Sequence, residues 1–183
     1  MSTSAEVRLR DGSVAVLRAV PYDDPVARDL VVRVQQEYVD RYGGPDGAAV
    51  EPGDFSPPAG LFLVAEVGGE PAGCGAWRRH TGGDDPTVAE VKRVYVVPAL
   101  RRRGLAQVLV AALEDSARAS GYRAVVLNSG DRQPEALALY EALGYTPVPG
   151  YGLYAGEAGA VFLGRLLDEQ EDPDEEEERP WAS

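Results

Sequence analysis

The sequence has 183 residues, a formal net charge of −12 at pH 7 and one cysteine, Cys74. A chain of this length can bury a core as one domain, and a lone cysteine excludes an intrachain disulfide or a cysteine-based metal cluster. No segment is apolar enough to span a bilayer and the N-terminus has no signal-peptide pattern, so we expect a cytoplasmic protein without a membrane partner.

The negative charge is concentrated near the C-terminus, where nine acidic residues lie between positions 168 and 178. Such a run is typical of a solvated, disordered extension. We therefore predict one domain over residues 1–167 and an acidic tail over residues 168–183. The basic residues form only one short cluster, which argues against nucleic acid as a partner.

Cys74 and the only histidine, His80, have mainly structural interpretations. Cys74 lies within a predicted strand, where a buried thiol is expected. His80 stands at a strand end beside Thr81-Gly82-Gly83, a turn signal, which disfavours a role as catalytic base. One histidine cannot form a multi-histidine metal site, and we expect no metal.

The N-terminal part begins with two predicted strands, residues 7–10 and 14–20, around the turn dipeptide Asp11-Gly12. A helical pattern opens at Pro25 and ends near Gly43. The stretch from 45 to 60 is rich in Pro, Gly and Asp, and we expect a loop there.

The centre of the sequence predicts three strands followed by a helix. Residues 61–67 and 71–79 are joined by Gly68-Gly69, and residues 88–98 form an apolar run that Pro98 ends. From Leu105 to Ser120, apolar residues recur at the spacing of one helix face.

The last part predicts a strand over 123–127, a helix from Pro134 to Leu143, an aromatic and glycine-rich loop over 145–156, and a strand over 160–167. The strand, helix and strand that begin at residue 88 imply a parallel crossover. We therefore expect an α+β fold: a mixed sheet of six to seven strands with helices on both faces.

The turn between the central strand and its helix is a candidate phosphate site. Three arginines precede Gly104 there, and a small residue at a helix start leaves backbone N–H groups open to a phosphate. The pattern is neither a P-loop nor a dinucleotide-binding motif, because it lacks Gly-Lys-Ser/Thr and has one glycine. An ordinary basic strand-to-helix turn is the alternative.

Two motifs carry a family resemblance. Arg101, Gly104 and Ala106 fit Arg/Gln-x-x-Gly-x-Gly/Ala, and so the turn resembles the acyl-CoA loop of the GNAT N-acetyltransferase superfamily. Residues 133–145 resemble its second signature, Asn-x6-Tyr-x-x-x-Gly-Phe, with Gln, Tyr140 and a final Tyr at the matching positions. The resemblance covers about residues 60–167 and implies a GNAT-like fold and acetyl-CoA as acyl donor.

In that superfamily the loop amides hold the CoA pyrophosphate, and the preceding strand holds the pantetheine arm. The implied cofactor-binding positions are Val94, Tyr95, Val96, Arg101, Arg102, Arg103, Gly104, Leu105, Ala106, Gln107, Gln133 and Tyr140. The resemblance also makes Tyr140 the acid that protonates the leaving thiolate and the Val96 amide the donor to the thioester oxygen. Residue type and periodicity alone favour a core tyrosine at position 140.

Glu90 is the candidate base that removes a proton from the acceptor amine through water. By strand alternation it shares a face with Lys92, Val94 and Val96. Its structural alternative is an exposed strand-end carboxylate paired with Lys92 or Arg93. The implied mechanism is direct attack of the amine in a ternary complex.

The acceptor is expected to be an amine-bearing small molecule, peptide or protein, contacted by Tyr38, Phe55, Trp77, Tyr151 and Tyr154. Acidic loop residues favour a cationic acceptor; these are Asp46, Glu51, Asp54, Asp84 and Asp85. The rival functions are a non-catalytic CoA-binding or interaction module that uses the acidic tail, and a transferase of another acyl group. Sheet edges and exposed aromatic loops permit a homodimer without requiring one.

Overall fold

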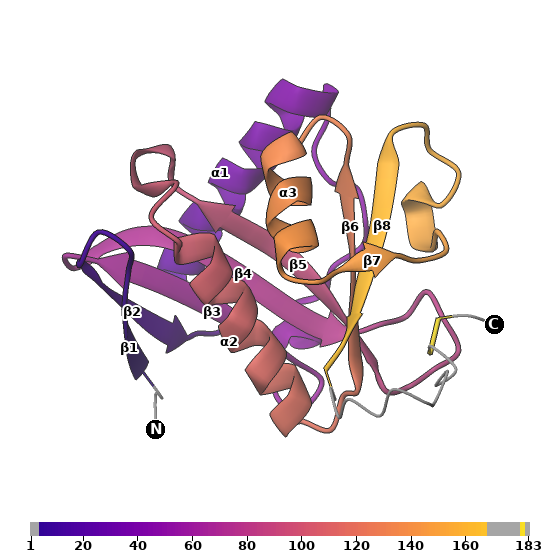
Figure 1. Ribbon diagram of the computed structural model, residues 1–183, viewed down its shortest axis with the longest axis horizontal. Coiled ribbons are helices and arrows are strands. Elements are labelled where there is room, and N and C mark those ends of the chain that lie inside the picture. The colour runs from indigo at the N-terminus through magenta and orange to yellow at the C-terminus, as the bar shows by residue number, and fades with distance from the viewer. Residues whose placement is uncertain (1–3, 168–179, 182–183) are drawn as a thin grey trace.

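The computed structural model describes residues 4–167 and 180–181, which form one eight-stranded sheet (Figure 1). The strands are β1 (Ser4–Arg8), β2 (Val14–Ala19), β3 (Gly60–Val67), β4 (Glu70–Arg79), β5 (Val88–Val96), β6 (Ala124–Gly130), β7 (Thr146–Pro147) and β8 (Ala160–Leu166). Their order is β1-β2-β3-β4-β5-β6-β8-β7, and only β5 and β6 are parallel neighbours among these strands. The mixed sheet is therefore confirmed.

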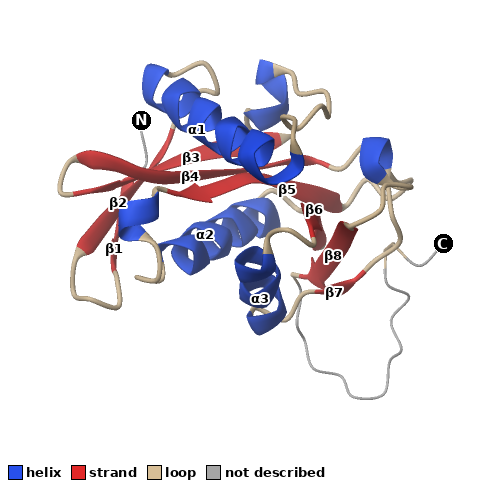
Figure 2. Ribbon diagram, turned by 90° about the horizontal axis from the view of Figure 1, so that it is seen from above, coloured by secondary structure: helices blue, strands red, loops and turns tan. Residues whose placement is uncertain are grey.

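Helices cover both faces of the sheet, as expected. Helix α1 (Pro25–Tyr42) lies on one face, and α2 (Leu105–Ala119) and α3 (Pro134–Ala142) lie on the other (Figure 2). Helix α1 starts where the Asp24 carboxylate accepts a hydrogen bond from the Val26 amide (2.8 Å), and it ends at Gly43 in the left-handed conformation.

The sheet has eight strands where six to seven were expected, and two of the differences from the expected strands have a clear physical reason. Strand β7 falls within the predicted loop, because a two-residue strand that contains a proline has no recognisable alternation. The first strand ends at Arg8 and not at Arg10, because the Leu9 amide donates to the Ser13 carbonyl (2.8 Å) and closes the hairpin turn there.

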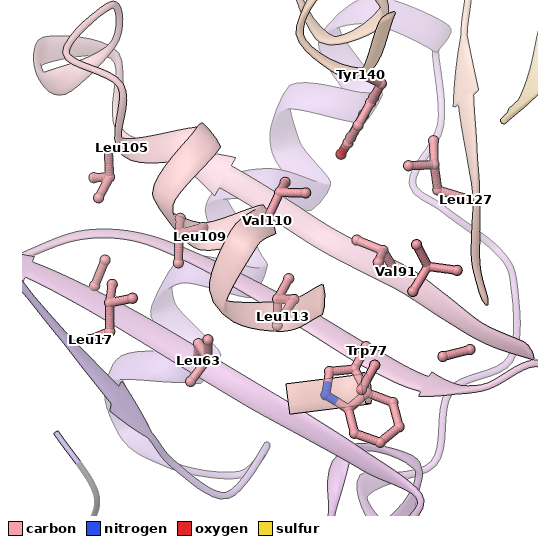
Figure 3. Close-up of a cluster of buried hydrophobic side chains, with 14 of the residues drawn as sticks. Leu17, Leu63, Trp77, Val91, Leu105, Leu109, Val110, Leu113, Leu127 and Tyr140 are labelled. Carbon is pink, nitrogen blue, oxygen red and sulfur yellow. The ribbon is translucent and has the colours of Figure 1, made fainter. Parts of the chain in front are cut away.

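The largest core cluster packs α2 against the sheet (Figure 3). Leu105, Leu109 and Leu113 form one stripe of α2, as their spacing predicts, and are at most 1% exposed. A second cluster lies between α1 and the opposite face of the sheet.

A third, smaller cluster contains Val88, Ala124 and Val126, and Trp181 packs against it. The predicted acidic tail lies mostly outside the described residues, but Trp181 belongs to this packing. Its ring comes within 3.3 Å of the position that a Cβ would take at Gly164.

Within residues 4–167 and 180–181, no helix is long and apolar enough to cross a membrane. In the same part of the chain, no group of three or more His, Cys, Asp or Glu residues is arranged to hold a metal ion.

Candidate active site

Strands β5 and β6 separate soon after they meet. Their parallel pairing joins Val88–Glu90 to Ala124–Val126 and stops there. Beyond Glu90 and Val126 the two strands diverge, as Figure 1 shows. The divergence opens a gap in the sheet.

A bulge in β5 accompanies this gap. Cys74 and Ala76 on β4 pair with Tyr95 and Lys92, so β5 carries one extra residue between those pairs. Within the bulge, Arg93 has φ of 60°, an uncommon conformation for a residue with a side chain. Contacts hold it: the Arg93 guanidinium pairs with Asp46, and its carbonyl accepts a hydrogen bond from the Cys74 thiol (3.3 Å). Burial raises the pKa of Cys74 to about 12, so this cysteine remains a buried thiol.

The bulge overturns the alternation expected for Glu90. Lys92 and Arg93 both reach Asp46 on the α1 side of the sheet. The extra residue then turns Val94 and Val96 toward the core beneath α2. Glu90 therefore shares a face with Lys92 but not with Val94 or Val96, because one inserted residue inverts the side-chain order.

The predicted phosphate loop has the backbone that an anion site requires. Gly104 has φ of 87°, and α2 starts at the next residue with no side chain capping its N-terminus. The first amides of a helix have no intrahelical acceptor, so those of Leu105 and Ala106 are available to a ligand oxygen. These open amides make the turn a candidate anion site.

The three predicted phosphate-binding arginines differ in position. Arg101 faces inward: its Nε donates to the Val96 carbonyl (2.9 Å), its Nη2 pairs with Glu37 (2.6 Å), and its guanidinium lies over the Tyr95 ring. Arg103 pairs with Asp11 (2.9 Å). Arg102 is exposed. Arg101 therefore braces the loop against α1.

The N-terminal hairpin adds an arginine that sequence analysis missed. The Arg10 amide donates to the Arg103 carbonyl (3.1 Å), and the Arg10 guanidinium donates to Gln107 on α2. Its Nε would lie 3.3 Å from a Cβ at Gly104. Arg10 is thus a fourth cation at the loop, brought there by pairing of β1 and β2 far away in the sequence.

Tyr140 lies at the gap from the α3 side. Its side chain points from α3 toward the sheet and is buried in the main core (Figure 3). Burial and, to a smaller extent, the Tyr38 phenol of α1 raise the pKa of Tyr140. The core and catalytic interpretations of Tyr140 are compatible.

A cavity of about 810 Å³ opens on the α1 side of the gap. Among the predicted site residues, its walls include Tyr38, Glu90, Gln133, Tyr151 and Tyr154. The central-strand residues 94–96 and the loop 101–107 do not line it, because they lie on the other side of the gap or at its end.

Phe55 and Trp77 are not at this cavity, which corrects two predicted acceptor contacts. Phe55 is 2% exposed and packs edge-on against Phe62 in the α1 cluster. Trp77 is 1% exposed on the α2 side, where its indole N–H donates to Ser116 (3.0 Å). Both are large aromatic residues, and burying them in the core removes much apolar surface from water.

Charged side chains on the cavity wall form an alternating series. Glu90 accepts from Arg78 Nε (2.9 Å), and Lys92 Nζ lies 3.7 Å from Glu90 and 3.4 Å from Asp46. Burial opposes ionisation of Asp46, but Lys92 and Arg93 lower its pKa to about 2. Glu90 is 5% exposed, so it is not the exposed strand-end carboxylate of the structural alternative. It does lie near Lys92, as that alternative expected.

Three of the five acidic residues expected to attract a cationic acceptor already have partners. Asp46 is neutralised by Lys92 and Arg93, and Asp54 pairs with Arg78 (2.9 Å). Asp85 accepts hydrogen bonds from Thr87.

Three polar groups on the cavity wall are buried without a hydrogen-bond partner: His80 Nδ1, Asn128 Nδ2 and the Tyr151 hydroxyl. The His80 and Tyr151 rings are in edge contact, with centroids 4.4 Å apart. Burial lowers the pKa of His80. The Tyr151 hydroxyl is near Glu90 but outside normal hydrogen-bond geometry, and burial together with that carboxylate raises its pKa. Neither His80 nor Asn128 was predicted, since only the folded chain brings them here.

Comparison with known proteins decides the family. Residues 28–145 match the acetyltransferase (GNAT) family. The chain belongs to the GNAT acetyltransferase family. It is 30% identical over 155 residues to "IAA acetyltransferase" of Azospirillum brasilense, which covers 85% of this chain and 99% of that protein.

Solved GNAT structures share the fold. The GNAT domain of S. lividans PAT superimposes with a TM-score of 0.68 at 23% identity, covering 89% of this chain and 96% of that domain. A GNAT acetyltransferase from Streptococcus pneumoniae gives a TM-score of 0.66 at 19% identity and covers 84% of this chain and 99% of its own. Sequence and fold together make this chain a GNAT acyltransferase.

Proposed function

We propose that the protein transfers an acetyl group from acetyl-CoA to a primary amine by direct attack within a ternary complex. The observation that carries the proposal is the end of β5–β6 pairing at Glu90 and Val126: beyond it β5 leads to the uncapped start of α2, and the 810 Å³ cavity is lined by Glu90 on one strand and Asn128 on the other. An acyl donor bound at the loop and an amine bound in the cavity would meet there. Acetyl-CoA supplies an activated acyl group as a thioester.

The donor would be held by backbone groups. The amides of Leu105, Ala106 and Gln107 at the α2 N-terminus would bind the pyrophosphate, with Arg10 and Arg102 adding positive charge. The parted edge of β5 over Val94 to Val96 offers backbone hydrogen-bonding groups for the pantetheine arm and, at the Val96 amide, for the thioester oxygen. Gln133 lies at the start of α3, beside the gap.

Tyr140 would protonate the leaving thiolate. Its raised pKa keeps the phenol protonated at physiological pH, and its side chain reaches the gap from the face opposite the cavity. An acid on that side can serve the leaving group without blocking the amine.

Glu90 would accept the amine proton through water. Glu90 accepts from Arg78 Nε (2.9 Å) and lies 3.7 Å from Lys92 Nζ, so its carboxylate is already partnered, which favours a water relay over direct contact with the amine. The cavity lining at Glu90 gives such a water a route to the acceptor.

The test is thiol release from acetyl-CoA by purified protein in the presence of a panel of primary amines, with propionyl-CoA and succinyl-CoA as alternative donors. Amine-dependent thiol release that is greatest with acetyl-CoA supports the proposal. Faster release with a longer acyl-CoA would contradict the acetyl assignment. Tight CoA binding without amine-dependent release would favour the non-catalytic module.

A further inference from the structure

The cavity contains a second recognition element that the proposed reaction does not use. Lys92 and Asn128 each lie two residues beyond the last β5–β6 pair, Glu90 with Val126. Because side chains alternate along a strand, Lys92 lies on the same face of the sheet as Glu90, and Asn128 lies on the same face as Val126. Both line the cavity, so they flank the opening gap from opposite strands on the acceptor side.

Both residues have hydrogen-bonding capacity to spare. Asn128 Nδ2 is buried without a partner, and Lys92 Nζ lies 3.4 Å and 3.7 Å from its two carboxylates, beyond a close N–H···O hydrogen bond. An ammonium has three N–H groups to donate and an amide nitrogen has two. Lys92 and Asn128 therefore both have donor capacity to spare.

The two carboxylates nearby already have donors. Asp46 accepts from Arg93, from the Ala48 amide (2.9 Å) and from the Tyr154 hydroxyl (3.0 Å), while Glu90 accepts from Arg78. A ligand that complements the spare donors of Lys92 and Asn128 brings oxygen atoms with negative charge. This is the reverse of the cationic acceptor that the acidic loop residues suggested.

The cavity also has the walls of a small-molecule site. The Tyr154 hydroxyl accepts from the Gly47 amide (2.7 Å) and ties the loop after α1 to the loop before β8. Arg41 and Arg132 donate to each other's carbonyls (both 2.8 Å) and join α1 to the loop before α3. A volume of about 810 Å³ lies in the usual range of small-ligand pockets.

We infer that the acceptor is a small α-amino acid, whose carboxylate is held between Lys92 Nζ and Asn128 Nδ2. This inference rests on the proposed function, because it places the amine between this carboxylate seat and Glu90, next to the gap. Lys92 Nζ and the Glu90 carboxylate lie 3.7 Å apart, so the amine and the carboxylate of one α-amino acid, which are close together, can face both groups. His80 and Tyr151 then border the space for the amino-acid side chain.

The test compares matched acceptors that differ only in the carboxylate: an amino acid, its amide and its decarboxylated amine, for example phenylalanine, phenylalaninamide and phenethylamine, with equivalent sets for leucine and glutamate. We expect kcat/KM to be at least about tenfold higher for the amino acid in the best set. Equal or faster turnover of the amides and amines in every set would overturn the inference while leaving amine acetylation intact. Absence of thiol release with every acceptor would overturn the proposed function as well.

The variant Asn128→Asp sharpens the test. It places a negative charge next to the proposed position of the substrate carboxylate, which it repels, but it does not repel an amine. The variant should lose at least about tenfold in kcat/KM for the amino acid and little for the decarboxylated amine. Asn128→Leu should reduce the preference without reversing it. The exposed α1 residue Gln36 supplies the control: Gln36→Glu makes the same change of charge outside the cavity and should alter neither value. An equal loss for both acceptors in Asn128→Asp would contradict the seat.

Discussion

The donor side of the gap, residues 94–107, and the acceptor cavity are built from different kinds of sequence. The donor side is one continuous strand, turn and helix start. The cavity takes its walls from five segments, within residues 38–49, 78–82, 90–92, 128–133 and 151–160. A backbone site made by consecutive residues can be inherited as a motif, whereas a side-chain site assembled from distant loops can vary freely on the same scaffold.

The two sides also differ in how they bind. The donor side offers the backbone amides of Leu105 and Ala106 at the start of α2. Its Arg101 already donates a hydrogen bond to the Val96 carbonyl. The acceptor side offers side chains whose charges nearly cancel. Damage to the donor side should therefore abolish binding of the acyl donor whatever the amine, and damage to the acceptor side should change which amine reacts.

The largest effect is expected for Gly104→Glu. The backbone there has φ of 87°, and a side chain would occupy the phosphate cradle next to Arg10. We expect acetyl-CoA affinity to fall at least about 100-fold by calorimetry, since both the open approach and the charge complementarity are lost.

Gly121→Glu is the matched control for strain. Gly121 has φ of 89° at the end of α2, with nothing near its Cβ position. Both variants should lose about 1–2 kcal/mol of folding stability from the left-handed conformation. Unchanged affinity in Gly104→Glu, or equal loss of affinity in Gly121→Glu, would break the assignment of the donor side.

Tyr140→Phe should reduce kcat by about 100-fold or more, as expected for loss of a general acid, with acetyl-CoA affinity nearly unchanged. Because burial raises the pKa of Tyr140, wild-type activity should show no loss from its ionisation up to about pH 10. Tyr122→Phe is the control, since Tyr122 and Tyr140 are each 6% exposed. Equal turnover in wild type and Tyr140→Phe would leave Tyr140 a core residue.

Asp46→Asn tests the electrostatics of the acceptor side. The pKa of Asp46 is lowered to about 2 from 3.8, so folding favours its ionised form. This stabilisation, about 2 kcal/mol, is complete above about pH 4 and disappears as the pH falls toward 2. The melting temperature of the variant should be lower than wild type at pH 6, and the difference should shrink on acidification.

Asp40→Asn provides a comparison for that pH series, because Asp40 is an exposed α1 residue that accepts a hydrogen bond from Gln36. The melting temperature of Asp40→Asn should equal that of the wild type at every pH from 6 to 2. A difference for Asp46→Asn that is constant from pH 6 to pH 2 would show that its carboxylate contributes no ion pairing.

Arg10→Ala should have the smallest effect, a loss of about three- to tenfold in acetyl-CoA affinity, as expected for one exposed cation near a phosphate. Its neighbour Arg8, which donates to the Gly12 carbonyl (3.1 Å) on the same hairpin, is the control. The loss should decrease at high salt. Equal affinity for Arg10→Ala and Arg8→Ala would remove Arg10 from the donor side.

The sequence by itself determined the elements with strong local signals. The apolar stripe from Leu105 to Leu113, the turn at Gly104 and the second motif around Tyr140 predicted the family and the mixed sheet, and they carry the proposed donor site. These features are local because helix periodicity and a strand-to-helix turn are written in consecutive residues.

Only the tertiary structure decided the rest. The extra residue at Arg93 inverted the faces expected after Glu90, and a bulge has no sequence period to reveal it. Phe55 and Trp77 lie in the core, whereas His80, Lys92 and Asn128 all line one cavity. Their partners are tens of residues away in the chain, and which polar groups remain unpaired depends on contacts that form only when the sheet and its loops are assembled.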